Sequence, residues 1–154
     1  MNILVKKVIP DVQLPSYATE GSAGFDLKAM RIMALYQGTK KVDLTEKMNR
    51  SIERGIITLR PGERALFGTG LSFTIPQGYE MQIRDKSGIS LKRGLKVFNA
   101  PGTIDSDYRG EINLGEYIAQ GVVAEYQKVN FQDSSLLEET NRGVGGYGST
   151  GNGL

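Results

Sequence analysis

LSFTIPQGYEMQI, residues 71–83, carries the clearest structural pattern of the chain. Leu71, Phe73 and Ile75 stand at every second position before a Pro-Gln-Gly segment, and the same alternation returns in residues 79–83. Because successive side chains of a β-strand point to opposite faces, each half predicts a strand with one buried face. Two such strands around a short Pro/Gly segment predict a β-hairpin.

The rest of the chain adds short strand candidates between frequent turn residues. They lie at residues 56–59, 65–67, 95–98, 112–114 and 117–129. Glycine accounts for 20 of the 154 residues, about 13% against a usual ~7%. Many short strands with frequent turns predict an all-β sandwich or barrel, and the length suits one domain.

One polar segment breaks this pattern. Between residues 37 and 54, Leu44, Met48 and Ile52 recur at every fourth position, which is one side of a helix. We therefore expect a short amphipathic helix at about residues 44–53, inserted into the β framework. Such a helix could lie on the flank of the barrel, or it could act as a lid or dock a protein partner.

Composition excludes several kinds of chemistry. The chain has no cysteine and no histidine, which excludes disulfides, thiol nucleophiles and Ser-His-Asp triads. With 19 Lys+Arg and 17 Asp+Glu the net charge is +2, which gives no support to nucleic-acid binding. No apolar run approaches the roughly 20 residues of a membrane span, and the first residues, MNILVKKVIPDV, lack a signal peptide's apolar stretch. We expect a soluble protein of the cytoplasm.

Two internal segments bring charged and hydroxyl side chains together with glycine. Residues 84–88, RDKSG, fit an anion cradle, although strands at a protein surface often end in such residues. Residues 102–111 read GTIDSDYRGE. If they are extended, Asp105 and Asp107 share a face and Tyr108 lies on the other. The two acids could form an acid/base pair, one of them could activate water, or the segment could be a solvated turn.

The C-terminal segment is rich in glycine. Residues 142–151, RGVGGYGSTG, place an arginine and an aromatic ring among five glycines. Such a tail cannot bury enough apolar surface to order itself, so disorder is the simplest expectation. The same composition can also wrap a ligand, because arginine grips phosphate and an aromatic ring covers a base.

The order and spacing of these patterns resemble one known family. The patterns are AGFDL at 23–27, KSG at 86–88, GTIDSDYRGE at 102–111, GEYIAQ at 115–120 and RGVGGYGSTG at 142–151. Together they resemble the homotrimeric dUTP diphosphatases (dUTPases) over nearly the whole chain. The resemblance implies an all-β jelly-roll or β-clip subunit at residues 1–141. Residues 142–154 would be a flexible tail closing over active sites that three subunits share.

The resemblance also implies residue roles. Asp105 would orient and deprotonate the attacking water, and the Tyr108 ring would pack under the deoxyribose and leave no room for a 2′-hydroxyl. Asp26 would hold water on a Mg²⁺ ion that is bound mainly to the substrate phosphates. The other substrate-binding residues implied are Lys86, Ser87, Gly88, Asn99, Gly102, Ile104, Gln120, Arg142, Tyr147, Gly148, Ser149 and Thr150.

Three departures from the family pattern are visible. Lys86 replaces the usual arginine, which loses the bidentate fork, and Tyr147 replaces a phenylalanine. Only Asn113 and Leu114 separate Ile112 from residue 115, where the family has a longer strand–turn–strand stretch.

The implied reaction is hydrolysis of dUTP to dUMP and pyrophosphate with Mg²⁺, which keeps uracil out of DNA. Three alternatives stay open. One is a regulatory nucleotide-sensing protein on the same scaffold, with a partner bound through residues 37–54. Another is a related dCTP deaminase, and a more distant one is a glycosidase.

Overall fold

The computed structural model describes residues 1–43, 52–53, 56–57, 59–114 and 118–146, and within them the chain is mostly β-strand. The strands are β1 (Leu4–Lys7), β2 (Phe25–Lys28), β3 (Arg31–Gln37), β4 (Lys40–Val42), β5 (Ile52–Glu53), β6 (Ile56–Ile57), β7 (Glu63–Gly68), β8 (Leu71–Thr74), β9 (Tyr79–Asp85), β10 (Gly102–Ile104), β11 (Asn113–Leu114) and β12 (Ile118–Glu125). The helix in this part of the chain is α2 (Ser87–Arg93). The predicted all-β class is confirmed.

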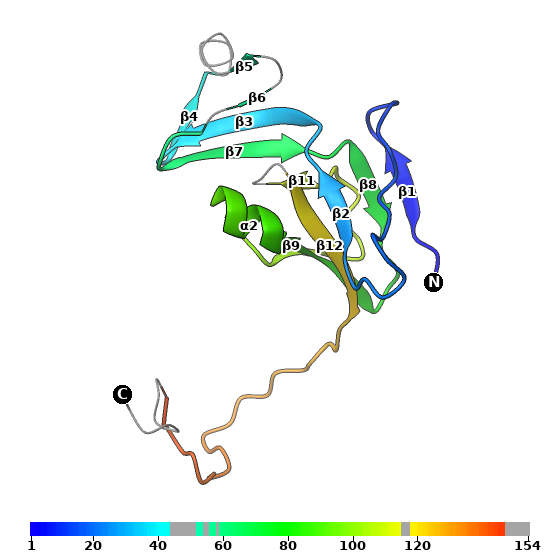
Figure 1. Ribbon diagram of the computed structural model, residues 1–154. Helices are drawn as coiled ribbons and strands as arrows, with labels where there is room; N and C mark the ends of the chain where they lie inside the picture. Colours follow the sequence, from blue (N-terminus) through cyan, green and yellow to red (C-terminus); the bar gives the residue numbers. More distant parts are fainter. Residues whose placement is uncertain (44–51, 54–55, 58, 115–117, 147–154) are drawn as a thin grey trace.

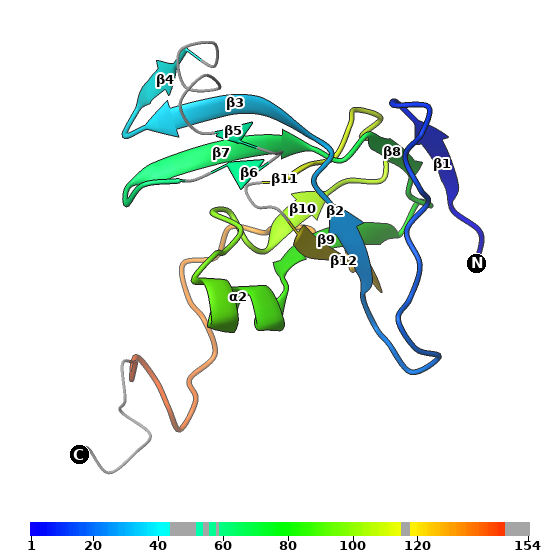
Figure 2. The ribbon, with the colours of Figure 1, turned by 45° about the horizontal axis from the view of Figure 1, so that its top comes forward.

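The strands form two layers around one apolar core (Figures 1 and 2). One four-stranded sheet has the order β10-β9-β12-β2 and the other β11-β7-β3-β4, with antiparallel pairing throughout. Leu27 and Met81 from the first sheet and Leu35 and Leu114 from the second are completely buried. Apolar burial between the sheets is therefore the main stabilising contribution to the fold.

The alternation in residues 71–83 predicts the buried apolar positions correctly, although Ser72 on the other face of β8 is buried too, and the predicted hairpin is wrong. Phe73 and Met81 are both buried, as expected. However, β8 pairs with the N-terminal strand β1, whereas β9 pairs with β10 and β12. The turn between them, in which the Tyr79 N–H donates to the Pro76 carbonyl oxygen at 3.1 Å, leads from one sheet into another. Alternation fixes the face of a strand and leaves its partner undetermined.

Two further predictions need correction. Residues 95–98 form no strand, because the Val97 N–H donates to the Asp85 side chain at 2.5 Å and joins no strand ladder. The predicted helix at 44–53 falls mostly outside the described residues. Its last two residues are strand β5, paired with β6. The helix α2 at Ser87–Arg93 was not predicted. It is two turns long, buries none of its residues and ends at Gly94 in the left-handed conformation.

Candidate functional site

The residues predicted to surround a nucleoside lie at one edge of the sheet β10-β9-β12-β2. Gly102 and Ile104 belong to β10, paired with Ile83 and Met81 of β9. A Cβ on Gly102 would stand 3.1 Å from the Asn99 side-chain nitrogen, so Asn99 packs directly against this glycine. The missing side chain of Gly102 therefore makes room for the Asn99 amide.

Asp105 and Tyr108 lie on a turn directly after β10. The Tyr108 N–H donates to the Asp105 carbonyl oxygen at 3.2 Å, which closes the turn. The side chains of Asp105 and Asp107 are exposed, and Tyr108 is 42% exposed. The segment is thus a turn and not an extended strand. The strand alternation that would place Asp105 and Asp107 on one face therefore does not apply.

A cavity of about 440 Å³ opens beside this turn. Three predicted residues, Asn99, Ile104 and Tyr108, line it. Further lining residues were not predicted: Tyr36, Arg64, Ala65, Leu66, Phe98, Glu111, Ile112 and Asn113. The sequence gives these residues no common signal, because they come from separate parts of the chain that only the folded sheets bring together.

Arg64 organises one wall of this cavity. Its guanidinium carbon stands 4.6 Å from the centre of the Phe98 ring and 6.0 Å from that of Tyr36. The same guanidinium donates to the Gly38 carbonyl oxygen. Cation–π contacts with two rings and a hydrogen bond hold the arginine in place. The cavity therefore has a wall that combines aromatic surface with positive charge.

A second group of predicted residues meets at the other edge of the same sheet. Lys86, which follows β9, forms an ion pair with Asp26 of β2. Gln120 of β12 donates its side-chain N–H to the other Asp26 carboxylate oxygen at 3.3 Å. Ser87 and Gly88 begin α2 beside Lys86 and are exposed. The fold thus brings together three predicted residues that lie far apart in the sequence.

The nucleoside residues and the Asp26–Lys86–Gln120 cluster are separated within one chain. Gly102 and Ile104 lie on the outer strand β10 and Asp26 lies on the outer strand β2, which is three strand spacings or about 14 Å away. Gln120 on β12 and Lys86, directly after β9, lie between them. One chain therefore presents two half-sites rather than one closed pocket.

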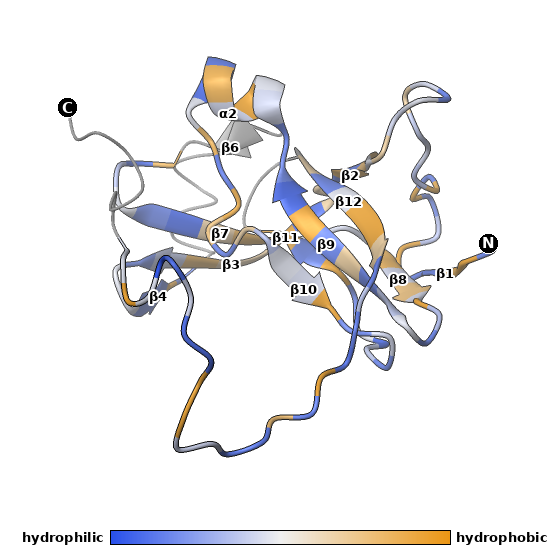
Figure 3. Ribbon diagram, turned by 90° about the horizontal axis from the view of Figure 1, so that it is seen from below, coloured by the Kyte–Doolittle hydropathy of each residue, from blue (hydrophilic) through white to orange (hydrophobic). Residues whose placement is uncertain are grey.

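The chain beyond β12 runs away from both sheets (Figures 1 and 3). Residues 126–146 contain neither helix nor strand. The Arg142 Nε–H donates to the Gly145 carbonyl oxygen at 2.8 Å, within the same segment. Arg142 is thus engaged locally and is not part of either cluster in this structure. Tyr147, Gly148, Ser149 and Thr150 lie outside the described residues.

Across the described ranges, no group of three or more Asp and Glu side chains stands close enough together to hold a metal ion. No helix in those ranges has the length and apolar character to cross a membrane.

The fold and the two clusters define a jelly-roll protein of the β-clip type, and comparison with known proteins identifies its family. The family model for dUTPase matches residues 52–151. A deoxyuridine 5'-triphosphate nucleotidohydrolase of Roseobacter denitrificans is 44% identical over 91% of this chain and 88% of its own length. One of Hydrogenobaculum sp. is 40% identical over 98% of this chain and 99% of its own. The chain belongs to the dUTPase family.

Solved structures confirm the fold. A mutant dUTPase of Staphylococcus bacteriophage 80alpha with dUpNHpp has a TM-score of 0.73 at 19% identity, covering 98% of this chain and 99% of that one. A mutant dUTPase of phage phi11 of S. aureus, described with a structural Mg(II) ion, has a TM-score of 0.66 at 16% identity, covering 90% of this chain and all of that one.

The alignment with the Hydrogenobaculum protein extends over 165 positions, more than the 154 residues of this chain. Part of that relative therefore has no counterpart here.

Proposed function

We propose that this chain hydrolyses dUTP to dUMP and pyrophosphate and so keeps uracil out of DNA. The observation that carries the proposal is the cavity at one sheet edge, which Asn99, Ile104 and Tyr108 line in a chain of the dUTPase family. The reaction uses nucleoside triphosphates, so we place the protein in the cytoplasm.

Asp105 acts as the base in this proposal. Its exposed carboxylate stands in the turn that Tyr108 closes, beside the cavity rather than inside the core. There it orients a water molecule and accepts a proton from it as the water attacks the α-phosphate. Tyr108 supports the deoxyribose and excludes a 2′-hydroxyl. Hydrolysis of this kind requires a positioned water, a base and positive charge near the phosphate oxygens, and none of these needs histidine or cysteine.

The Asp26–Lys86–Gln120 cluster supplies the phosphate side. The side chains of Lys86 and Asp26 are each about one-third exposed, so both are accessible to a ligand. Lys86, Ser87, Gly88 and Gln120 bind phosphate oxygens. The oxygens of Asp26 suit a water-mediated contact to Mg²⁺, which prefers oxygen ligands and keeps several of its waters. When bound, the ion neutralises charge on the triphosphate.

The separation of the two half-sites supports a homotrimer. Because β9 and β12 lie between Gly102 and Ile104 on β10 and Asp26 on β2, we propose that the nucleoside residues of one copy face the Asp26–Lys86–Gln120 cluster of another. The tail, residues 142–154, closes over the nucleotide, with Arg142 and Thr150 on phosphates and Tyr147 over the base.

The test is a substrate panel on the purified full chain. We expect pyrophosphate release from dUTP with Mg²⁺, and at least about 100-fold lower kcat/KM for dCTP and UTP. The cytosine base of dCTP leaves polar atoms of the site unpaired, and the 2′-hydroxyl of UTP clashes with the Tyr108 ring. Ammonia release from dCTP would instead identify a deaminase. Binding of dUTP without turnover would favour the regulatory alternative. A sizing column tests the trimer separately.

A further inference from the structure

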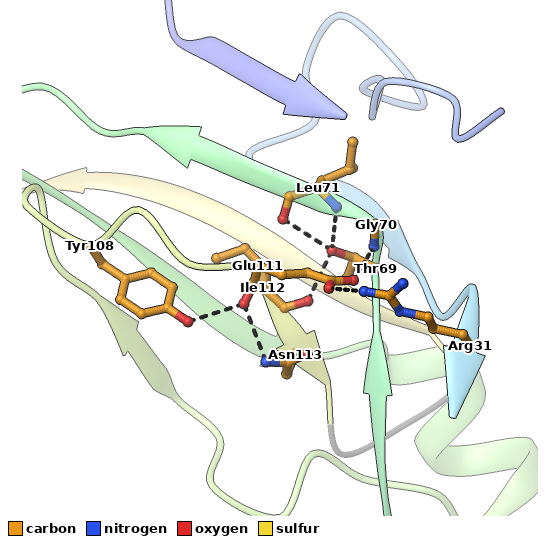
Figure 4. A network of polar contacts seen from close by, with 8 residues as sticks. All are labelled: Arg31, Thr69, Gly70, Leu71, Tyr108, Glu111, Ile112 and Asn113. Carbon is orange, nitrogen blue, oxygen red and sulfur yellow. Dashed lines mark hydrogen bonds and ion pairs between the residues drawn. The ribbon is translucent and has the colours of Figure 1, made fainter. Parts of the chain in front are cut away.

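The carboxylate of Glu111 is an internal anchor at the junction of the two sheets (Figure 4). Its side chain is only 11% exposed. One oxygen accepts the Gly70 N–H at 2.6 Å, and the other accepts a guanidinium N–H of Arg31 at 2.5 Å. Arg31 begins β3 and Gly70 lies between β7 and β8, so one carboxylate joins the 105–114 segment to both elements.

The surrounding backbone is shaped for this carboxylate. A Cβ on Gly68 would stand 2.5 Å from the Glu111 Oε1, so only glycine leaves room for it there. Ile112, the residue after Glu111, is held by backbone hydrogen bonds to the same connection. The Ile112 carbonyl oxygen accepts the Thr69 N–H at 3.1 Å, and the Ile112 N–H donates to the Leu71 carbonyl oxygen at 2.9 Å. Residues 111–112 are therefore fixed to the β7–β8 connection.

The other side of Glu111 holds Tyr108. The Tyr108 hydroxyl donates to the Glu111 carbonyl oxygen at 3.1 Å (Figure 4). The ring folds back over Gly110, where a Cβ would stand 2.3 Å from that hydroxyl. The place of the Tyr108 ring is thus set by where the Glu111 carbonyl lies and by the absence of a side chain at position 110.

We propose that Glu111 is a positioning residue for sugar selection, acting through Tyr108. Its carboxylate fixes the Glu111 backbone, the Glu111 carbonyl fixes the Tyr108 hydroxyl, and the fixed ring separates deoxyribose from ribose. This inference rests on the proposed function, because it deepens the role that the proposal gives to Tyr108.

The negative charge of Glu111 suits the two donors that it binds. Both partners of the carboxylate are N–H donors, so a glutamine would turn one of its own N–H donors toward Gly70 or Arg31. An alanine would leave the part-buried Gly70 N–H without this acceptor and would release the Arg31 side chain, which is 42% exposed, to the solvent. Either change frees residues 108–111 to shift, and small displacements of a positioning contact have large effects on rate.

The experiment compares kcat/KM for dUTP and UTP in Glu111→Gln and Glu111→Ala. We expect the dUTP/UTP ratio to fall roughly tenfold in Glu111→Ala and about threefold in Glu111→Gln. Arg31→Ala should lower it as well, and the Arg31→Ala/Glu111→Ala double variant should fall less than the product of the single effects. Glu80→Gln is the matched control, since Glu80 accepts a hydrogen bond from Gln82 on β9 and is not part of this network. Its ratio should stay unchanged.

A purely structural role gives a different result. Loss of folded protein lowers the rates for dUTP and UTP by the same factor and leaves their ratio unchanged, which would overturn the inference. If the wild-type chain does not hydrolyse dUTP, the proposed function fails and the second readout decides on Glu111 alone. In ring-labelled protein, with the Tyr108 signals assigned from Tyr108→Phe, these signals should shift in Glu111→Gln and not in Glu80→Gln. Unshifted Tyr108 signals would refute the anchor.

Discussion

Residues 105–114 and residues 126–146 both follow strands of the sheet β10-β9-β12-β2, but the rest of the chain holds the first segment much more firmly than the second. Residues 105–114 are bound to the body through Glu111 and Ile112, and Ile112 and Leu114 are completely buried. Residues 126–146 carry apolar side chains that contact little, with Phe131 95% and Leu137 88% exposed. The side-chain hydrogen bonds observed in that segment join residues three positions apart or closer, such as Arg142 to Gly145.

The two segments differ in how many of their apolar side chains are buried by the rest of the chain. A buried apolar side chain contributes about 1.5–3 kcal/mol to stability, and an exposed one contributes almost nothing. The 105–114 segment therefore has its geometry before any ligand arrives. The apolar side chains of the 126–146 segment are exposed, so they are accessible to a nucleotide or another copy, as the proposed closing tail and homotrimer require.

The largest effect is expected at the base in the organised segment. Asp105→Asn removes the proton acceptor but keeps the size of the side chain, so kcat for dUTP should fall about 1,000-fold or more while nucleotide binding stays within a few-fold. Steady-state rates and calorimetric titration with a non-hydrolysable dUTP analogue measure the two quantities.

Asp107→Asn is the control for this change, since Asp107 is an exposed carboxylate on the same turn. Its kcat should remain within about threefold of wild type. Equal losses in both variants would instead indicate that the two carboxylates act as a pair in dUTP hydrolysis, and an active Asp105→Asn would remove the proposed base.

The next effect concerns the unpacked segment. Deleting residues 142–154 should lower kcat/KM for dUTP by roughly 10- to 100-fold, because the residues proposed to close over the phosphates and base are lost. The melting temperature without nucleotide should change by less than about 2 °C, since none of the deleted described residues is buried. A truncated chain with full activity would contradict the closing tail.

The resemblance of the sequence motifs to the dUTPases predicted site residues that lie far apart in the sequence. Asp26, Lys86 and Gln120 were named from that resemblance, and the structure brings them together. No motif pointed to Arg64, and the motif that contains Glu111 gave this residue no role. Their partners are 26 to 80 positions away, so their roles depend on strand pairing. The hairpin error has the same origin, because β1 rather than β9 completes β8.

A smaller effect is expected where the organised segment meets the β7–β8 connection. The Thr69 hydroxyl is buried, donates to the Ile112 carbonyl oxygen at 2.9 Å and accepts the Leu71 N–H at 3.2 Å. Thr69→Val keeps the shape but leaves both backbone groups without this partner, which should lower the free energy of unfolding by about 1–3 kcal/mol. Thr69→Ser keeps the hydroxyl and should lose less than about 1 kcal/mol. Urea denaturation of both variants measures the difference, and equal losses would show that the methyl group contributes as much as the hydroxyl.

The smallest effect should come from the unpacked segment itself. Phe131→Ala removes a ring that is 95% exposed, so the free energy of unfolding should change by less than about 0.5 kcal/mol at concentrations where sizing shows a monomer. Phe73→Ala, the same chemical change in a ring that is 4% exposed, should cost about 3–5 kcal/mol. If the cost of Phe131→Ala grows with protein concentration, this ring packs against another copy, because association stabilises the folded state by mass action. A cost close to that of Phe73→Ala in the monomer would mean that the chain packs this segment on itself, and the contrast between the two segments would not hold.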